Sequence, residues 1–129
     1  RQMCIRDREG TGNERRALIY ALHNFEALGL TGGILHVNGK IVAFTFGMPI
    51  NHETFGVHVE KADTSIEGAY AMINYEFANR IPEQYIYINR EEDLGIEGLR
   101  KAKLSYQPAT ILEKYMACLK EHPMNMVKW

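Results

Sequence analysis

The dipeptide Asn38-Gly39 constrains the fold more than any other short stretch of this sequence. It lies between two apolar runs, residues 34–37 and 41–46, whose β-branched and aromatic side chains favour strands. Asn-Gly is the strongest short-range hairpin signal, because both residues accept the positive φ angles of a tight turn. A third run, residues 54–60, is predicted to pair antiparallel with the second. Strict alternation predicts two faces in this run, one with Phe55, Val57 and Val59 and the other with Thr54, Gly56, His58 and Glu60.

Two amphipathic helices are predicted on either side of these strands. Residues 13–28 repeat apolar side chains every three or four positions, with Asn13 as the predicted N-cap and Gly29 as the predicted C-cap. Residues 64–80 do the same and begin with Thr64 and Glu67, the pair that forms a capping box. A further strand is predicted at residues 85–88. A helix between two strands indicates a β-α-β crossover.

The last part of the chain is predicted to add one helix and one strand. The helix is expected at about residues 94–103 with Asp93 as its cap, and the strand at residues 109–116. The predicted order is therefore α-β-β-β-α-β-α-β. We expect an α+β fold of three α/β layers, in which helices cover both faces of a mixed, twisted sheet. This order is similar to the later part of a GNAT-type acyltransferase fold.

Composition limits the class of protein. The 129 residues include 15 Lys+Arg and 16 Asp+Glu, so the formal net charge is -1 and any RNA contact has to be local. Cys4 and Cys118 form no C-x-x-C pair, which predicts a reduced, cytoplasmic chain. No apolar run approaches the ~18 residues of a membrane span.

One domain is expected, at residues 13–119. Residues 1–8 lack helical or strand periodicity and residues 9–12 are predicted to form a loop, so residues 1–12 are expected to be disordered or foreign. They resemble the translated adapter sequence found at the ends of metagenomic reading frames. Residues 120–129 are expected to form a loose tail.

The strongest candidate site is the run Asn-Arg-Glu-Glu-Asp at residues 89–93. It follows a predicted strand and precedes a helix, where α/β folds place their ligands. Arg90 can grip a carboxylate or phosphate, and Asn89 can hydrogen-bond a peptide-like substrate. Glu91 or Asp93 can act as a base. The structural alternative is that Arg90 pairs with these carboxylates, which then only cap the helix.

A second candidate lies at residues 60–63, Glu-Lys-Ala-Asp, where the third strand leads into the second helix. Free amides at this helix start can hold an anion with help from Lys61, unless Asp63 satisfies those amides itself. The glycine-rich pyrophosphate loop of an acetyl-CoA-binding GNAT domain is missing from this sequence. The carboxylates of Glu60, Asp63 and Glu67 would also repel a pyrophosphate, which argues against ordinary use of CoA.

The other candidate polar residues each have a purely structural explanation as well as a functional one. Asn74 either reaches the sheet edge from the second helix or has a structural role, on a solvated helix face or in a structural hydrogen bond. Arg100, Lys101 and Lys103 form a basic cluster that the helix dipole alone favours, although it can also contact phosphates of RNA or lipid. The five histidines show no metal-ligand spacing, so no metal site is predicted.

Several sequence segments together resemble those of one bacterial family. They are residues 28–33, 39–44, 57–63 and 68–77, and above all Asn-Arg-Glu-Glu-Asp-Leu-Gly at 89–95 with Leu-Arg-Lys-Ala-Lys-Leu-Ser-Tyr at 99–106. Over roughly residues 13–115 the chain resembles the small soluble branch of the phosphatidylglycerol lysyltransferase C-terminal domain family. The resemblance implies a duplicated GNAT-like fold. This chain would be its second half, and an N-terminal GNAT-like half would be its missing partner.

The same resemblance implies kinship with enzymes that move an aminoacyl group from aminoacyl-tRNA to a lipid or peptidoglycan-type amine or hydroxyl. Those enzymes need no CoA, so no cofactor is expected. The alternatives are a GNAT N-acetyltransferase that uses acetyl-CoA and a noncatalytic binding half that completes its partner's site or docks tRNA. By position and chemistry, the candidate catalytic residues are Glu60, Arg90 and Glu91, and the candidate substrate-binding residues are Asn89, Lys61, Asn74, Arg100 and Lys103.

Overall fold

The computed structural model describes residues 8–91, 96–115 and 117, which form three helices and one four-stranded sheet. The elements in chain order are α1 (Arg8–His23), β1 (Thr31–Val37), β2 (Lys40–Pro49), β3 (Thr54–Ala62), α2 (Ala69–Ala78), β4 (Tyr87–Asn89) and α3 (Glu97–Leu104). The sheet order is β1-β2-β3-β4. The α+β class is confirmed.

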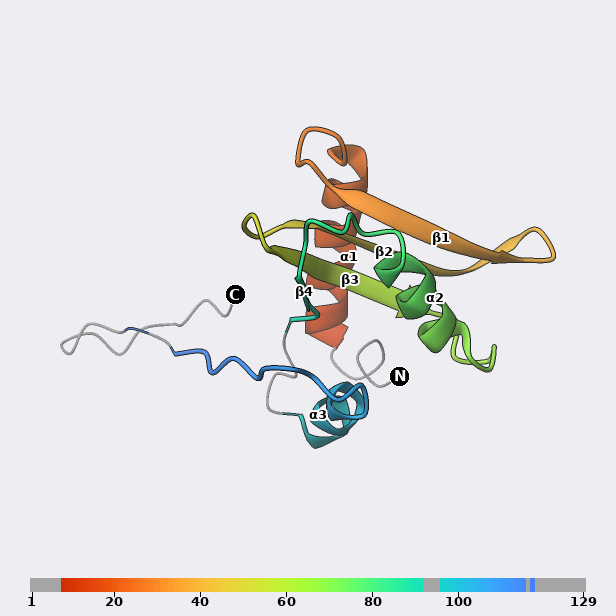
Figure 1. The fold of residues 1–129 in the computed structure, drawn as a ribbon. Coiled ribbons are helices and arrows are strands. Elements are labelled where there is room, and N and C mark those ends of the chain that lie inside the picture. The colour runs from red at the N-terminus through yellow and green to blue at the C-terminus, as the bar shows by residue number, and fades with distance from the viewer. Residues whose placement is uncertain (1–7, 92–95, 116, 118–129) are drawn as a thin grey trace.

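The predicted hairpin and crossover are both confirmed. Asn38 and Gly39 have φ angles of 50° and 77°, and β1 and β2 pair antiparallel on either side of them. Strand β3 pairs antiparallel with β2. Strand β4 then lies parallel to β3, because the chain returns through α2 between them (Figure 1). The sheet is therefore mixed.

Helices α1 and α2 lie on opposite faces of the sheet, so the three-layer expectation is confirmed (Figure 1). On the α2 face, Phe55 packs edge-on against Phe77, with 5.9 Å between ring centroids, and against Tyr85 at 5.6 Å. On the α1 face, Phe25 packs edge-on against Phe46 at 6.0 Å. Aromatic contacts thus join α2 to β3 and the turns after α1 to β2.

The first helix lies five residues earlier than predicted. Because α1 runs from Arg8 to His23, Asn13 is inside it and is not the N-cap, and the predicted loop at residues 9–12 is wrong. Glycine's weak helix propensity, about 1 kcal/mol per residue, is overridden here. Residues 24–29 form turns that end at Gly29, whose φ is 68°. The Leu30 amide donates to the Phe25 carbonyl at 3.0 Å, so Gly29 ends these turns, but it is not the predicted C-cap because α1 already ends at His23.

The capping box predicted for the second helix does not form. Helix α2 begins at Ala69, and its N-cap is Gly68, with φ 78° and no side-chain cap. The preceding residues turn because Asp63 Oδ1 accepts hydrogen bonds from both the amide and the hydroxyl of Ser65. The helix also ends at Ala78 rather than near Arg80.

The predicted last strand, residues 109–116, is wrong over its described part. Residues 109–115 have no strand conformation, and Ile111, Leu112 and Tyr115 are exposed. A strand needs a neighbouring edge to complete its hydrogen bonds, and β4 offers only three residues. Helix α3 begins at Glu97 with Ile96 at the N-cap, whereas the predicted cap Asp93 lies outside the described residues.

Candidate functional site

The candidate site lies where the pairing between β3 and β4 ends. Their parallel pairing covers three residue pairs and ends at Gly56 with Asn89. Strand β3 continues to Ala62, whereas the chain leaves β4 at once. The last six residues of β3 therefore have no β4 partner. Polar side chains from the residues just after β4 reach across this opening.

A β-bulge decides which side chains enter the opening. Gly47 pairs with Val57 and Phe46 pairs with Val59, so His58 is the extra residue of β3. The bulge shifts the alternation by one position. Glu60 contacts Asn74 of α2, on the same face as the buried Phe55 and Val57. The predicted division of β3 into two faces is therefore wrong beyond Val57.

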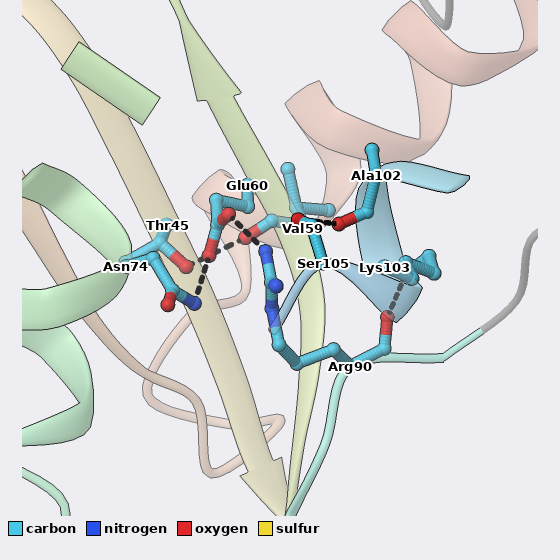
Figure 2. A network of polar contacts seen from close by, with 8 residues as sticks. All are labelled: Thr45, Val59, Glu60, Asn74, Arg90, Ala102, Lys103 and Ser105. Atoms are coloured by element: carbon cyan, nitrogen blue, oxygen red, sulfur yellow. Dashed lines mark hydrogen bonds and ion pairs between the residues drawn. The ribbon is translucent and has the colours of Figure 1, made fainter. Parts of the chain in front are cut away.

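Glu60 is the centre of the site (Figure 2). Its Oε1 accepts a hydrogen bond from Arg90 Nη2 at 2.7 Å, and its Oε2 accepts one from Asn74 Nδ2 at 3.2 Å. The Glu60 side chain is 11 % exposed and that of Arg90 is 26 % exposed. Buried Thr45 on β2 donates to the Val59 carbonyl at 2.8 Å, which fixes the backbone beside Glu60. The Glu60 carboxylate is thus held by Arg90, which follows β4, and by Asn74 of α2, while Thr45 of β2 holds the neighbouring backbone.

Arg90 is held from the opposite side by α3 and the residues after it. The ring of Tyr106 lies 4.3 Å from Arg90 Cζ, a cation–π contact. Lys103 Nζ donates to the backbone carbonyl of Arg90 (Figure 2). Arg90 Nε is buried and has no hydrogen-bond partner among the described residues. The guanidinium is therefore fixed in place with one donor still unmet, which is an expensive arrangement in a protein interior.

Asn89 and Glu91 form a second contact across the opening. The Asn89 Oδ1 atom accepts the Glu91 amide at 2.8 Å, and Glu91 has a φ of 59°. This local turn points the Glu91 side chain at His58 Nδ1, with which it makes a hydrogen bond. Sequence reasoning missed His58. The available signal was glycine at positions 47 and 56, because glycine inside a strand pattern often marks a bulge.

The structure brings most of the predicted site residues together, but not all. Glu60, Asn74, Arg90 and Lys103 form one network, and Asn89 and Glu91 lie beside it. Lys61 pairs instead with Glu14 of α1, on the other face of the sheet. Arg100 is exposed on α3 and is not part of the network in Figure 2.

A hollow of about 340 Å³ opens at the N-terminus of α2. It shares Tyr106 with the Arg90 contact, so the hollow and the network adjoin. Its lining residues are Thr64, Ile66, Glu67, Gly68, Ala69, Tyr70, Ala71 and Tyr106. The nearby Asp63 accepts hydrogen bonds from Ser65, which lower the pKa of its carboxyl. Asp63 is therefore negative at neutral pH, and with Glu67 it keeps this end of α2 acidic.

The described residues contain no group of three or more His, Cys, Asp or Glu side chains that could hold a metal. Nor does any described helix have both the length and the apolar character that crossing a bilayer requires.

Comparison with known families decides the relationship. The model of the family described as phosphatidylglycerol lysyltransferase, C-terminal, matches residues 5–118. The chain belongs to this family. The fold agrees with that membership, because family and structure together make the chain an acyltransferase-like domain of GNAT-like fold.

Two solved structures are similar to this member of the lysyltransferase C-terminal family. A conserved protein of unknown function from Bacteroides thetaiotaomicron VPI-5482 is 97% identical over 88% of this chain, with a TM-score of 0.83. The chain spans 38% of the length of that protein. A ribosomal-protein-alanine N-acetyltransferase from Brucella melitensis biovar Abortus 2308 is 16% identical, with a TM-score of 0.59, and the match covers 78% of this chain and 79% of the other. The second likeness concerns the fold alone. A search of curated proteins finds no match.

Proposed function

We propose that this domain helps to transfer an aminoacyl group from aminoacyl-tRNA to the amine or hydroxyl of a lipid or peptidoglycan-type acceptor. The observation that carries the proposal is the fixed Arg90, with its unmet donor, in the opening between β3 and β4. Membership of the lysyltransferase C-terminal family supports the reaction class. Transfer of this kind needs no cofactor.

We assign to Arg90 the binding of the ester carbonyl oxygen of the donor substrate. The acceptor would attack the ester carbonyl carbon, and negative charge would develop on the carbonyl oxygen. A guanidinium already fixed by Glu60 and Tyr106 would stabilise that charge without reorganising. Glu60 and Asn74 would orient the arginine, because the Glu60 carboxylate is nearly buried and both of its oxygens accept hydrogen bonds.

The remaining predicted residues keep more peripheral roles in the proposal. Lys103 holds the backbone at Arg90, and Asn89 shapes the turn that follows β4. Lys61 and Arg100, which lie outside the network, stay candidates for contact with tRNA or a lipid headgroup. We further propose that an N-terminal GNAT-like half completes the site and that the reaction takes place in the cytoplasm.

The hollow beside α2 favours a second candidate, an N-acetyltransferase that uses acetyl-CoA. The N-terminus of α2 has no side-chain cap and no acidic residue in its first turn, and such a helix start can accept a phosphate group. Glu67 in the lining and ionised Asp63 nearby oppose this reading. A noncatalytic half that binds tRNA is the third candidate.

Transfer of radiolabel from a mixed aminoacyl-tRNA pool to lipid extract and to peptidoglycan precursors tests the proposal. We would assay this chain and the longer Bacteroides thetaiotaomicron protein, each with Arg90→Ala and Arg90→Lys at the same sequence position. Both variants are expected to lose at least about tenfold in rate, because lysine lacks the planar fork of arginine.

Arg80→Ala is the matched control, since Arg80 pairs with Glu76 on an exposed helix surface. It is expected to transfer at the wild-type rate. Absence of transfer to every acceptor, together with saturable acetyl-CoA binding, would replace the proposal with the acetyltransferase. Salt-sensitive binding of tRNA without transfer would replace it with the binding half.

A further inference from the structure

We propose that the hollow at the start of α2 receives the terminal adenosine of the aminoacyl-tRNA; this inference rests on the proposed function above and names the part of the donor that the hollow recognises. The aminoacyl ester is attached to the ribose of that adenosine. A domain that holds the ester carbonyl at Arg90 therefore has the adenine base only one sugar ring away. The volume of the hollow, about 340 Å³, is in the usual range of sites for small molecules.

Two tyrosines connect the hollow to the network around Glu60. Tyr106 lines the hollow, and the centroid of its ring lies 4.3 Å from Arg90 Cζ. Tyr70 also lines the hollow and lies one helical turn before Asn74, which donates to Glu60. Residues one turn apart share a face of a helix, so the hollow and the network are neighbours along one face of α2.

The ring of Tyr106 offers the base a flat surface within reach of Arg90. Arg90 covers one face of the ring, and Tyr106 is still 49% exposed. Proteins commonly bind unpaired bases by stacking them on aromatic side chains. A base on the opposite face would lie about 8 Å from Arg90 Cζ, because a second contact of ~3.5–4 Å adds to the first of 4.3 Å. The ribose and the ester together span that gap to the guanidinium, which is 26% exposed.

The rest of the lining suits an uncharged base better than a phosphate. Ile66, Ala69 and Ala71 are apolar, and of the described residues that line the hollow only Glu67 carries a charge. An ionised carboxylate accepts hydrogen bonds but cannot donate them. Adenine has an exocyclic amino group that donates, whereas Glu67 and the ionised Asp63 nearby repel a phosphate. Aromatic, apolar and acidic groups together therefore favour adenosine.

The test is equilibrium binding to the longer Bacteroides thetaiotaomicron protein with changes at the same sequence positions. The probes are an aminoacyl-adenosine in which an amide replaces the ester, the matching inosine compound, and the methylamide of the same amino acid. The adenosine compound is expected to bind at least about tenfold more tightly than the methylamide, because its base stacks on Tyr106. Ala71→Trp fills the hollow and is expected to remove this gain, with the affinity for the methylamide unchanged.

Two further variants test the stacking and the hydrogen bond separately. Tyr106→Phe keeps the ring and is expected to bind the adenosine compound as the wild type does. The wild type is expected to bind the inosine compound several-fold more weakly, because inosine has a carbonyl where adenosine has the amino group. Glu67→Gln is expected to remove this preference, since an amide can donate as well as accept. Equal affinities of the wild type for adenosine and inosine would overturn the role of Glu67.

Met72→Trp is the matched control, because Met72 is exposed on the same helix and is not among the residues that line the hollow. It is expected to bind the adenosine compound with wild-type affinity. Equal wild-type affinities for the adenosine compound and the methylamide, or a gain that survives in Ala71→Trp, would overturn the role of the hollow.

Coenzyme A also carries an adenosine, so acetyl-CoA is the competing occupant. Binding of acetyl-CoA that Ala71→Trp abolishes, without binding of the adenosine compound, would overturn the inference in its favour. The transfer assay with aminoacyl-tRNA decides the proposed function separately. Wild-type transfer together with no effect of Ala71→Trp on binding or rate would overturn the role of the hollow and leave the proposed function intact. Absence of transfer would overturn the proposed function, whatever the hollow binds.

Discussion

At the scale of single residues, the pair of Glu60 and Arg90 has the largest energetic consequence. The Glu60 carboxylate is almost buried, so it depends on Arg90 and Asn74 for the interactions that water would otherwise supply. Removing one member of such a pair leaves a charge without compensation, whereas removing both costs less. Arg80 and Glu76 form a chemically similar pair in solvent, where the same change has little effect.

Arg90→Met is therefore expected to lower the free energy of unfolding by about 1–3 kcal/mol, because Glu60 loses its charged partner. The double variant Glu60→Gln/Arg90→Met is expected to recover part of this loss. Urea denaturation of the two single variants and the double variant measures the coupling. Arg80→Met is the control, with a change within about 0.5 kcal/mol. Strictly additive effects at residues 60 and 90 would show that the ion pair contributes nothing.

Asp63 gives a prediction about pH. Hydrogen bonds from Ser65 lower the pKa of its carboxyl below the ordinary 3.8. A depressed folded-state pKa adds stability that is fully present above the unfolded value and is lost as the pH falls through the folded value. In Ser65→Ala the pKa of Asp63 is expected to rise toward 3.8, as followed by NMR titration of its carboxyl carbon. An Asp63 pKa that is the same in both proteins would contradict the assigned cause.

At the scale of secondary structure, the bulge in β3 is the feature on which the site depends. It moves Glu60 to the α2 face and takes His58 out of the pairing with β2. Two glycines allow close approaches here, Gly47 between β2 and β3 and Gly56 between β3 and Ile50, which follows β2. A Cβ atom on Gly47 would lie 1.9 Å from the Gly56 carbonyl oxygen, and one on Gly56 would lie 2.9 Å from the Ile50 side chain.

Gly47→Ala is expected to destabilise the protein by about 3 kcal/mol, because the backbone of β3 has to move away. The same substitution at Gly12 is the matched control. That glycine lies inside α1 with no atom near its missing Cβ, so alanine there is expected to stabilise the helix by up to about 1 kcal/mol. Thermal unfolding of both variants is the measurement. Equal midpoints would contradict the close approach of β2 and β3.

Local chemistry explains which elements could be predicted from the sequence. The hairpin at Asn38 and Gly39 follows from two residues that tolerate positive φ, and the crossover follows from the spacing of strand, helix and strand. The glycines at positions 47 and 56 indicate a bulge only indirectly, and the residue that it leaves unpaired could not be predicted, because that depends on which residue of β2 faces β3. The capping box failed because Asp63 bonds Ser65 and turns the chain before α2 begins.

The candidate site could also be predicted only in part from the sequence. The sequence indicated the residues after β4, because a charged run directly follows an apolar strand. It did not indicate that Arg90 reaches Glu60, some thirty positions away, since that contact depends on the bulge. It also favoured the third-helix cluster equally at Arg100 and Lys103, and did not indicate that Lys103 donates to the backbone carbonyl of Arg90.

At the scale of the whole molecule, exposed apolar side chains near β4 and after α3 offer a surface that the proposed N-terminal half can cover. Ile86 and Tyr87 are 69% and 51% exposed, and Ile111, Leu112 and Tyr115 are exposed in the segment after α3. Large apolar side chains that are exposed on a strand at the edge of a sheet commonly mark a contact with another domain. The chain spans 38% of the similar Bacteroides thetaiotaomicron protein, which has further residues available to cover them.

We therefore expect the backbone amides of residues 86–89 to exchange with deuterium more slowly in that longer protein than in this chain alone. Hydrogen-exchange mass spectrometry on both proteins under the same conditions is the measurement. The amides of β2, which is paired on both sides, serve as the internal reference. Equal exchange at residues 86–89 in the two proteins would show that the additional residues leave this edge uncovered.

The central claim is that Arg90 contacts the donor substrate. It is tested most directly by NMR of arginine Nε–H groups during titration with an aminoacyl-adenosine in which an amide replaces the ester. The signal that disappears in Arg90→Lys identifies the residue. The Arg90 signal is expected to shift to saturation, because the ligand contacts the exposed part of its guanidinium and changes the surroundings of Nε, while the Arg80 signal stays fixed. A titration that leaves the Arg90 signal unmoved would contradict the account.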